Sequence, residues 1–288
     1  MEFSIVIPTY KRSNNLTKAI DSILEQSNDS VEIIIVDDNG LGSQQQIETY
    51  NSLKEYINNN RIKYIANKNN MGGGLARNVG ASHSVGNYLG FLDDDDTFIQ
   101  GKIEHHKKLF EKGYDITLSS MLIKEDGKAI KNETWCYANG NSLKEFIISG
   151  NAYTPMIMVR REIFLNAGGF DNVKMLQDHI LMLKLLKVSD KIIFSREKYF
   201  IHNVHSGERV SKKLDYSCLL KKQNLELYFS NKLDDKEQKK LAIKHCKERS
   251  IYIQFNKNYL KSVTYGVQGI LSIRDRQDCI YFIKYMSR

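Results

Sequence analysis

The sequence has few of the features that mark linkers, disulfide frameworks or membrane spans. Only 2 of its 288 residues are proline, which excludes a proline-rich linker. No apolar run approaches the roughly 18 residues that a membrane-spanning helix requires. The 4 cysteines are far apart and form no CxxC pair: Cys136, Cys218, Cys246 and Cys279. We interpret them as reduced thiols of a cytosolic protein.

The N-terminal segment lacks the basic region of a secretory signal peptide. Residues 1–8 enter a strand-like apolar pattern at once, so we expect no cleaved leader. A hydrophobic content of 41% and a charged content of 26% are ordinary for a globular protein and argue against disorder. At this length we expect one large α/β domain, alone or with a helical extension.

Positive charge is concentrated in the last quarter of the chain. The net charge is +8, and residues 215–288 hold 15 Lys and Arg against 8 Asp and Glu, a surplus of 7. Such a region suits an anionic partner, for example a membrane surface or a diphosphate-linked substrate. A nucleic-acid binder would also be basic, but the acidic cluster at residues 93–96 argues against that class.

Short apolar runs alternate with helical patterns through the first part of the chain. Runs at residues 3–8, 31–36 and 61–65 have strand length, and helical patterns at 16–26 and 44–58 separate them. This order predicts a parallel sheet with right-handed crossovers. Further strands are expected at 88–92, 114–119, 154–159 and 191–194, and further helices at 102–112, 161–167 and 175–186. From residue 215 on, the pattern is helical and lysine-rich.

The most informative stretch is residues 88–97 (YLGFLDDDDT), an apolar strand followed at once by four aspartates. Adjacent carboxylates repel one another, and aspartate favours neither helix nor strand. In open α/β sheets, ligands bind beyond the carboxyl ends of the strands, where this cluster falls. We therefore expect a hard divalent cation, Mg²⁺ or Mn²⁺, to bind here. A solvated acidic turn is the alternative.

A second polar stretch, residues 67–78 (NKNNMGGGLARN), precedes a predicted helix. Glycines permit close approach of the backbone to a ligand, and a cation before a helix is a common way to hold phosphate. The stretch does not have the GxGxxG spacing of a dinucleotide-binding turn. A plain turn and a loop that closes over a ligand both fit the three glycines.

Seven segments occur in the order and at the spacings of one enzyme family: residues 5–10 (IVIPTY), 35–39 (IVDDN), 76–80 (ARNVG), 91–96 (FLDDDD), 168–171 (GGFD), 177–178 (QD) and 204–207 (VHSG). Together they make the chain resemble the inverting family 2 glycosyltransferases, which use nucleotide-diphosphate sugars. The resemblance implies the GT-A fold: α/β and Rossmann-like, with a mainly parallel central sheet flanked by helices. Its motifs span residues 3–211, and a C-terminal helical extension follows them.

The resemblance implies a nucleotide site at the ends of the first two strands. Pro8, Thr9 and Tyr10 would lie against the base and ribose. Asp38 would accept a hydrogen bond from a uracil N–H, a task that suits a carboxylate. Arg77 would offset the charge of the diphosphate.

The resemblance also assigns the acidic cluster to a DXD element. Asp93 would hold the ribose, Asp94 would contribute to the donor site, and Asp95 would bind Mn²⁺ or Mg²⁺. Asp94 and Asp96 have a second interpretation, in which they ligate the metal or only shape the turn. The metal would stabilise the charge that develops on the diphosphate as the sugar–phosphate bond breaks.

An inverting transfer needs a base opposite the leaving group, to take the proton from the acceptor hydroxyl. The family places it at the second residue of a Glu-Asp pair, which here is Asp178. The preceding residue is Gln177 instead of Glu, so whatever the glutamate does in the family is open here. His205 matches a position that serves as a further metal ligand or phosphate contact, and His202 is a competitor for that role.

The domain and partner predictions follow from the same resemblance. Residues 1–212 would form the catalytic domain, with a nucleotide-sugar half (1–97) and an acceptor half (98–212). Residues 213–288 would form a basic helical region, interpreted as a cap, a membrane contact or an oligomerisation element. The donor would be a UDP-sugar and the acceptor a saccharide or lipid-linked oligosaccharide, in bacterial surface polysaccharide synthesis. We expect a cytoplasmic protein, peripheral on the inner face of the membrane, with no nucleic-acid partner.

Two rival functions remain at this point. Residues 93–97 (DDDDT) also fit the DxDxT motif of haloacid-dehalogenase phosphatases, with Asp93 as the nucleophile. That interpretation leaves residues 3–80 unexplained. The other rival is a relative that binds nucleotide-sugar without turning it over.

Overall fold

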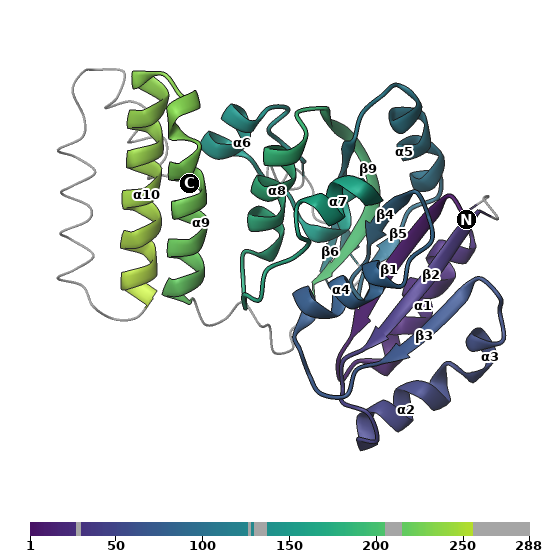
Figure 1. Ribbon diagram of the computed structural model, residues 1–288. Helices are drawn as coiled ribbons and strands as arrows, with labels where there is room; N and C mark the ends of the chain where they lie inside the picture. The colour runs from purple at the N-terminus through teal and green to yellow at the C-terminus, as the bar shows by residue number, and fades with distance from the viewer. Residues whose placement is uncertain (27–29, 126–127, 130–136, 205–214, 256–288) are drawn as a thin grey trace.

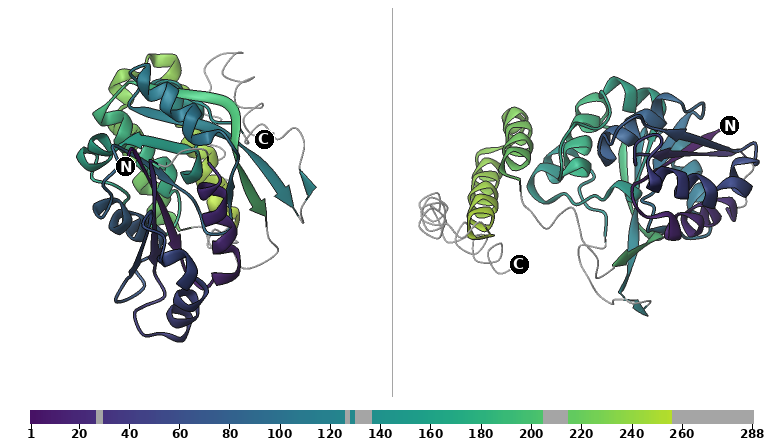
Figure 2. Two further views of the ribbon diagram at one scale, coloured as in Figure 1. Left: turned by 90° about the vertical axis from the view of Figure 1, so that its right-hand side faces the viewer. Right: turned by 90° about the horizontal axis from the view of Figure 1, so that it is seen from below.

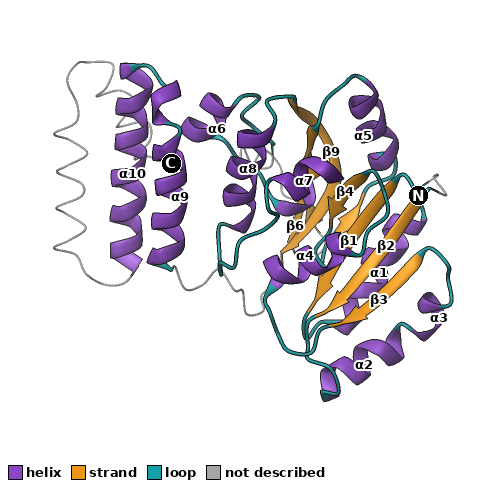
Figure 3. Cartoon of the chain, in the orientation of Figure 1, coloured by secondary structure: helices purple, strands orange, loops and turns teal. Residues whose placement is uncertain are grey.

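A computed structural model describes residues 1–26, 30–125, 128–129, 137–204 and 215–255 (Figure 1). These residues form a nine-stranded sheet flanked by helices, and a pair of helices beside it (Figure 3). The first part alternates strands and helices: β1 (Phe3–Thr9), α1 (Ser13–Leu24), β2 (Val31–Asp37), α2 (Gln44–Ser52), α3 (Lys54–Ile57), β3 (Ile62–Ala66), α4 (Gly73–Ser82) and β4 (Tyr88–Phe91).

The second part of the chain completes the sheet. Its elements are β5 (Thr97–Phe98), α5 (Lys102–Glu111), β6 (Ile116–Glu125), β7 (Lys128–Ala129), α6 (Leu143–Ser149), the 3₁₀ turn η2 (Thr154–Met156), β8 (Ile157–Arg160), α7 (Arg161–Asn166), α8 (Gln177–Val188) and β9 (Ile192–Val204). The strand order is β3-β2-β1-β4-β8-β6-β9-β5, and β7 pairs with β6. Pairing is parallel from β3 through β4 and mixed beyond it.

The register of the parallel strands places their carboxyl ends at one edge. Thr9 of β1 lies opposite Asp37 of β2, and Val6 lies opposite Phe91 of β4. Every residue of β1 and β2 is buried, as expected for parallel strands that are covered on both faces. The polar residues that follow these strands therefore emerge together at the edge where α/β proteins bind ligands.

The C-terminal helices form a separate layer beside α6 and α8 (Figures 1 and 2). They are α9 (Tyr216–Tyr228), the 3₁₀ turn η4 (Ser230–Lys232) and α10 (Asp235–Phe255). In the part of the chain that the structure describes, no helix is both long enough and apolar enough to cross a bilayer. The predicted helical character of this region is confirmed as far as Phe255.

Some sequence-based boundaries are wrong. The helix expected at 44–58 is broken at Leu53, which leaves helical geometry (φ −104°, ψ 2°) as its side chain enters the core. The strand expected at 191–194 continues to Val204, because β9 pairs with β6 along its length. The glycine stretch is not wholly a loop, since Gly73 and Gly74 form the first turn of α4.

Candidate active site

The four aspartates form a tight turn directly after β4. The turn is closed by a hydrogen bond from the backbone N of Asp96 to the carbonyl of Asp93, 3.1 Å long. The side chains of Asp93 and Asp95 are 34% and 15% exposed, against 8% for Asp94 and 1% for Asp96. By this difference in exposure we call Asp93 and Asp95 the outward carboxylates of the turn, and Asp94 and Asp96 the inward ones.

The inward carboxylate of Asp94 joins the turn to β1. It accepts a hydrogen bond from Thr9 Oγ1, 2.8 Å away, and its other oxygen lies 3.6 Å from a guanidinium nitrogen of Arg12. Arg12 also forms an ion pair with Asp95. Burial raises the pKa of Asp94 to about 7, and the charge of Asp95 adds to that effect.

The inward carboxylate of Asp96 joins the turn to β9. It accepts from the backbone N of Asn203 at 3.0 Å and lies 3.1 Å from Nδ1 of His202. The side chain of Asn203 in turn donates to the carbonyl of Asp95, 2.8 Å away. Burial raises the pKa of Asp96 to about 6, against the lowering effect of His202. The pKa of His202 is also raised, because its hydrogen bond and attraction to Asp96 outweigh burial.

Arg77 connects the outward side of the turn to α8. Its Nη2 forms an ion pair with Asp93, and its Nη1 donates to Oε1 of Gln177 at 2.9 Å. The guanidinium also lies 5.4 Å from the ring centre of Phe170, in cation–π range. The Nε2 of Gln177 donates to the carbonyl of Val173, 2.8 Å away, so this glutamine is held from both sides.

The glycines explain why these segments can meet. A Cβ on Gly74 would lie 3.1 Å from the carbonyl oxygen of Asp171 and 3.3 Å from Oε1 of Gln177. A Cβ on Gly169 would lie 2.4 Å from the Asn78 side chain, which pairs with both backbone groups of Phe170. Both glycines thus permit a close approach of α4 to the segment before α8.

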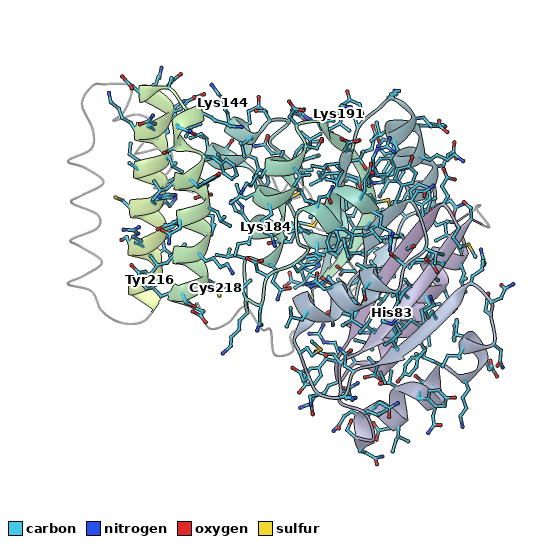
Figure 4. The ribbon with its side chains drawn as sticks, viewed as in Figure 1. His83, Lys144, Lys184, Lys191, Tyr216 and Cys218 are labelled. Carbon is cyan, nitrogen blue, oxygen red and sulfur yellow. The ribbon has the colours of Figure 1, made fainter. Side chains whose placement is uncertain are left out.

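Lys184 of α8 holds that segment from the other side (Figure 4). Its ammonium donates to the carbonyl of Gly169 at 2.6 Å and to a carboxylate oxygen of Asp171 at 2.7 Å. The second oxygen of Asp171 pairs with Lys221 of α9 at 2.7 Å. The loop between α7 and α8 is therefore held by α8 on one side and by α9 on the other.

Asp178 lies in the first turn of α8, next to Gln177. One of its carboxylate oxygens accepts from the backbone N of His179 at 2.8 Å. Burial raises the pKa of Asp178 to about 6; Arg77 lowers it and Asp93 raises it, so both charges are near. The residue before the helix, Leu176, has φ +60°, which is strained for a branched side chain and typical of functional sites. A carboxyl with such a pKa suits proton transfer near neutral pH.

Asp38 organises the glycine-rich segment. Its carboxylate accepts hydrogen bonds from the side chain of Asn67 and from the backbone N–H groups of Met71 and Gly72, at 2.7–3.1 Å. Gly72 has φ +84° and precedes α4. These three donors occupy most of the roughly four acceptor positions of the carboxylate, and about one position remains for a base.

The structure brings together most of the residues that were predicted from sequence. Thr9 and Asp94 are in contact, as are Arg77 and Asp93, and Asp178 lies within electrostatic reach of that pair. Tyr10 is 44% exposed at the edge of β1, and Pro8 lies within β1 opposite Val36. His205 lies outside the described residues.

Sequence reasoning missed two residues that contact the turn. Arg12 and Asn203 both contact the aspartate turn, and neither is part of a recognised segment. His202 is the histidine that contacts the turn in the described structure. The sequence did contain a signal for His202. Side chains alternate along a strand, so His202 lies on the same face as Phe200, which is fully buried.

The outward carboxylates are a suitable donor set for a divalent metal. Mg²⁺ and Mn²⁺ are bound by one or two carboxylates together with water and substrate phosphates, so a preformed cage is not needed. Asp93 and Asp95 are the accessible pair, and each is already paired with a guanidinium. Burial, and after it repulsion among the carboxylates, raises the pKa of Asp94, Asp95 and Asp96, so a cation bound at the turn would be attracted to all of them. These residues therefore fit a cation.

The chain belongs to glycosyl transferase family 2, whose sequence profile matches residues 4–167, more than half of its length. An uncharacterized glycosyltransferase of Rickettsia felis is 32% identical over 184 residues, which are 63% of this chain and 30% of that protein. Another, from Haemophilus influenzae, is 29% identical over 221 residues, 73% of this chain and 79% of that protein. The chain therefore spans less than a third of the Rickettsia relative.

A longer match is to a Campylobacter jejuni protein named GalNAc(5)-diNAcBac-PP-undecaprenol beta-1,3-glucosyltransferase. It is 26% identical over 271 residues, which are 90% of this chain and 84% of that protein. Among solved structures, Staphylococcus aureus TarS 1–349 in complex with UDP-GlcNAc superposes with a TM-score of 0.64 at 18% identity. That alignment covers 91% of this chain and 89% of TarS.

These comparisons confirm the predicted GT-A class of α/β fold and the glycosyltransferase family. Its sequence thus places the chain among the glycosyltransferases by family. Membership in this family also accounts for residues 4–80, which the phosphatase interpretation of Asp93 leaves unexplained.

Proposed function

We propose that this enzyme transfers a sugar, with inversion, from a UDP-sugar to a saccharide hydroxyl in a metal-dependent reaction. The observation that carries the proposal is the junction of Arg77, Asp93 and Gln177 beside Asp178. It joins α4, the end of β4 and the first turn of α8, and Arg77 and Gln177 are 100 residues apart in sequence. A diphosphate cation, a metal-binding carboxylate and a base are the parts that inverting transfer requires.

In this mechanism Asp178 is the catalytic base. The acceptor oxygen attacks the anomeric carbon, its proton passes to the Asp178 carboxylate, and the bond to the phosphate oxygen breaks. UDP leaves with the electron pair of that bond. The pKa of Asp178, raised to about 6 by burial, leaves the carboxylate ionised at neutral pH while keeping it basic enough to accept the proton.

The remaining site residues bind the donor. Arg77 offsets the charge of the diphosphate, and Asp93 holds the ribose. Asp95 holds Mn²⁺ or Mg²⁺, which when bound would neutralise the diphosphate and assist departure of UDP. Asp94 supports the site through Thr9 rather than by direct contact, because its carboxylate is buried.

Three further assignments are kept as proposals. Pro8, Thr9 and Tyr10 flank the nucleotide, and Asp38 reads the uracil edge while it holds the glycine segment. His205 stays a predicted metal or phosphate contact. The division into a catalytic region (1–212) and a basic C-terminal region (213–288) fits the separate layer formed by α9 and α10.

For the acceptor we propose a lipid-linked saccharide on the cytoplasmic face of a bacterial membrane, as part of surface polysaccharide synthesis. The name of the Campylobacter jejuni relative, which specifies an undecaprenol-diphosphate acceptor, supports this class. The surplus of positive charge from residue 215 onward supports peripheral contact with anionic lipid.

A thermal-shift titration tests the donor site. UDP, GDP, CDP and TDP are each added with Mn²⁺ or with EDTA, because a ligand stabilises the folded state by RT ln(1 + [L]/Kd). We expect a shift with UDP that needs Mn²⁺ and that is lost in Asp95→Asn. Asp190→Asn, in the loop before β9, is the matched control and should retain the shift. A folded protein with no shift for any nucleotide would refute the donor site.

A further inference from the structure

Glu226 of α9 is a carboxylate with no exposed surface, enclosed by the helices beside the site. Its oxygens lie 2.6 Å from Lys244 and 2.7 Å from Nε2 of His245, both on α10. Lys222, one turn earlier on α9, lies 3.6 Å away. The fourth partner is His179 of α8, whose Nε2 lies 2.9 Å from Glu226.

The contact with His179 joins the C-terminal helices to the helix that carries Asp178. Burial lowers the pKa of His179 to about 4, so its imidazole is neutral, and only a protonated Nε2 can donate to the carboxylate. The ring also packs on Phe146 of α6, with 4.7 Å between ring centres. Lys244 donates to the carbonyl of Ile147, so α6 is held to the same cluster.

The contact continues from His179 to the proposed base. The backbone N–H of His179 donates to a carboxylate oxygen of Asp178 at 2.8 Å. Residue 179 is thus fixed through its side chain by Glu226, and its main chain fixes the carboxylate of Asp178. Leu176 just before the helix is in the strained left-handed region, which needs support from surrounding contacts to persist.

The charges of the cluster indicate a structural joint rather than a ligand site. Glu226, His245 and Glu248 bring ligand atoms within 4.8 Å of one another, as a metal site would. However, Lys222 pairs with Glu248, and Lys244 pairs with Glu226. Two carboxylates are matched by two ammonium groups, so the cluster has no need of a cation.

We propose that Glu226 and His179 are positioning residues for the reaction, so that α9 supports the helix that carries Asp178. This inference rests on the proposed role of Asp178 as base. Removal of the Glu226–His179 hydrogen bond lets the first turn of α8 relax and moves the Asp178 carboxylate. Small displacements of a catalytic group are costly, so the loss falls on kcat rather than on donor binding.

The test compares His179→Leu with His245→Leu. Each variant removes one imidazole from Glu226, but only the first lies on α8. UDP release is measured with UDP-glucose and UDP-GlcNAc in Mn²⁺, with water as acceptor. We expect His179→Leu to lower kcat about 10- to 100-fold with KM for the donor unchanged within about twofold, and His245→Leu to keep kcat within about threefold.

Two further measurements separate positioning from general damage. His179→Gln, whose amide can still donate to Glu226, should recover most of the lost kcat. In the Glu226→Leu background, His179→Leu should add little, because the contact is already gone. If Glu226→Leu does not fold, the comparison of the two histidines decides the question.

The outcomes distinguish this inference from the proposed function. Equal kcat for the two leucine variants, or a glutamine variant as slow as leucine, overturns the positioning role and leaves the proposed function intact. A folded wild-type protein that neither binds UDP nor releases it from any UDP-sugar overturns both.

Discussion

Two buried clusters of charged side chains in this molecule differ in how far their negative charge is neutralised by neighbouring positive charge. The aspartate turn after β4 packs four carboxylates against Arg12, Arg77 and His202. Burial and the repulsion among these carboxylates raise the pKa of Asp94 to about 7 and that of Asp96 to about 6. The turn therefore carries more negative charge than its surroundings compensate.

The cluster at Glu226 is also deeply buried, but its carboxylates are neutralised by neighbouring ammonium groups. Burial alone would raise the pKa of Glu226, yet the hydrogen bonds from His179 and His245 and the charges of Lys244 and Lys222 hold it well below its ordinary range. The comparison teaches that burial does not by itself identify a functional carboxylate. Uncompensated charge indicates where a ligand is expected, and compensated charge indicates where elements are joined.

The largest effect is expected at the base. Asp178→Asn should lower kcat by about 10²- to 10⁴-fold, because the amide cannot accept the acceptor proton. Affinity for UDP with Mn²⁺ should stay within about twofold, because in the proposed mechanism Asp178 takes the proton of the acceptor and does not bind the nucleotide. Steady-state UDP release and a binding titration measure the two quantities. A variant that retains wild-type kcat would remove Asp178 from the mechanism.

The wild-type pH profile gives an independent check on the same residue. Only the ionised carboxylate is a base, and burial raises the pKa of Asp178 to about 6. We expect kcat to be flat above this pKa and to fall about tenfold per pH unit below it. A plateau that extends unchanged to pH 4.5 would contradict the assignment.

Removing the charge from the compensated cluster should cost much of the stability of the protein. Glu226→Gln leaves the buried ammonium of Lys244 without its carboxylate, and breaking a buried pair in this way costs about 3–5 kcal/mol of unfolding free energy. Urea unfolding at pH 7.5 measures the loss. A loss below about 1 kcal/mol, the range of exposed ion pairs, would mean that the cluster is not a structural joint.

Removing a charge from the aspartate turn should instead increase the stability of the protein. Asp94→Asn keeps an acceptor for Thr9 and removes one charge, so the metal-free protein should gain about 1–2 kcal/mol of unfolding free energy at pH 8. Asp115→Asn is the matched control, because Asp115 is paired with Arg160 at 2.8 Å and its neutralisation should destabilise. Destabilisation in both variants would remove the contrast between the two clusters.

The smallest expected effect is the way in which the contributions of Asp94 and Glu226 to stability change with pH. The pKa of Asp94 is raised in the folded state, so the folded protein binds the proton more tightly and gains stability as the pH falls from 8 toward 4. The advantage of Asp94→Asn should therefore shrink over that interval. The pKa of Glu226 is depressed, so its contribution is present above its unfolded pKa, near 4.5, and is lost below it. Urea titrations at several pH values measure both trends.

Local patterns predicted much of the fold and part of the site. The runs that became β1, β2 and β4 are mainly apolar and do not alternate with polar residues, so their burial on both faces could be predicted from the chain. Asp93 and Asp95 follow the strand that became β4, which placed them at the edge where its carboxyl end lies. Asp178 was found because it belongs to a motif with a known order.

Contacts between residues far apart in the chain could not be predicted from local sequence patterns. Arg12 reaches Asp95 across 83 residues, and Gln177 reaches Arg77 across 100. The second half of β9 was missed because exposed polar residues such as Glu197 interrupt its apolar pattern. His179 and Glu226 were not predicted at all, since a single histidine and a single glutamate in helices are ordinary surface residues until packing buries them.

The sequence by itself determined the order of strands and helices, the edge of the sheet at which the aspartates emerge, and the chemistry available there. These properties depend on hydrophobic period and on residue type, which neighbours in the chain express directly. Only the tertiary structure decided which charges are compensated. Compensation depends on distance and burial across segments far apart in sequence, so Asp94 and Glu226 differ in function through their surroundings and not through their side chains.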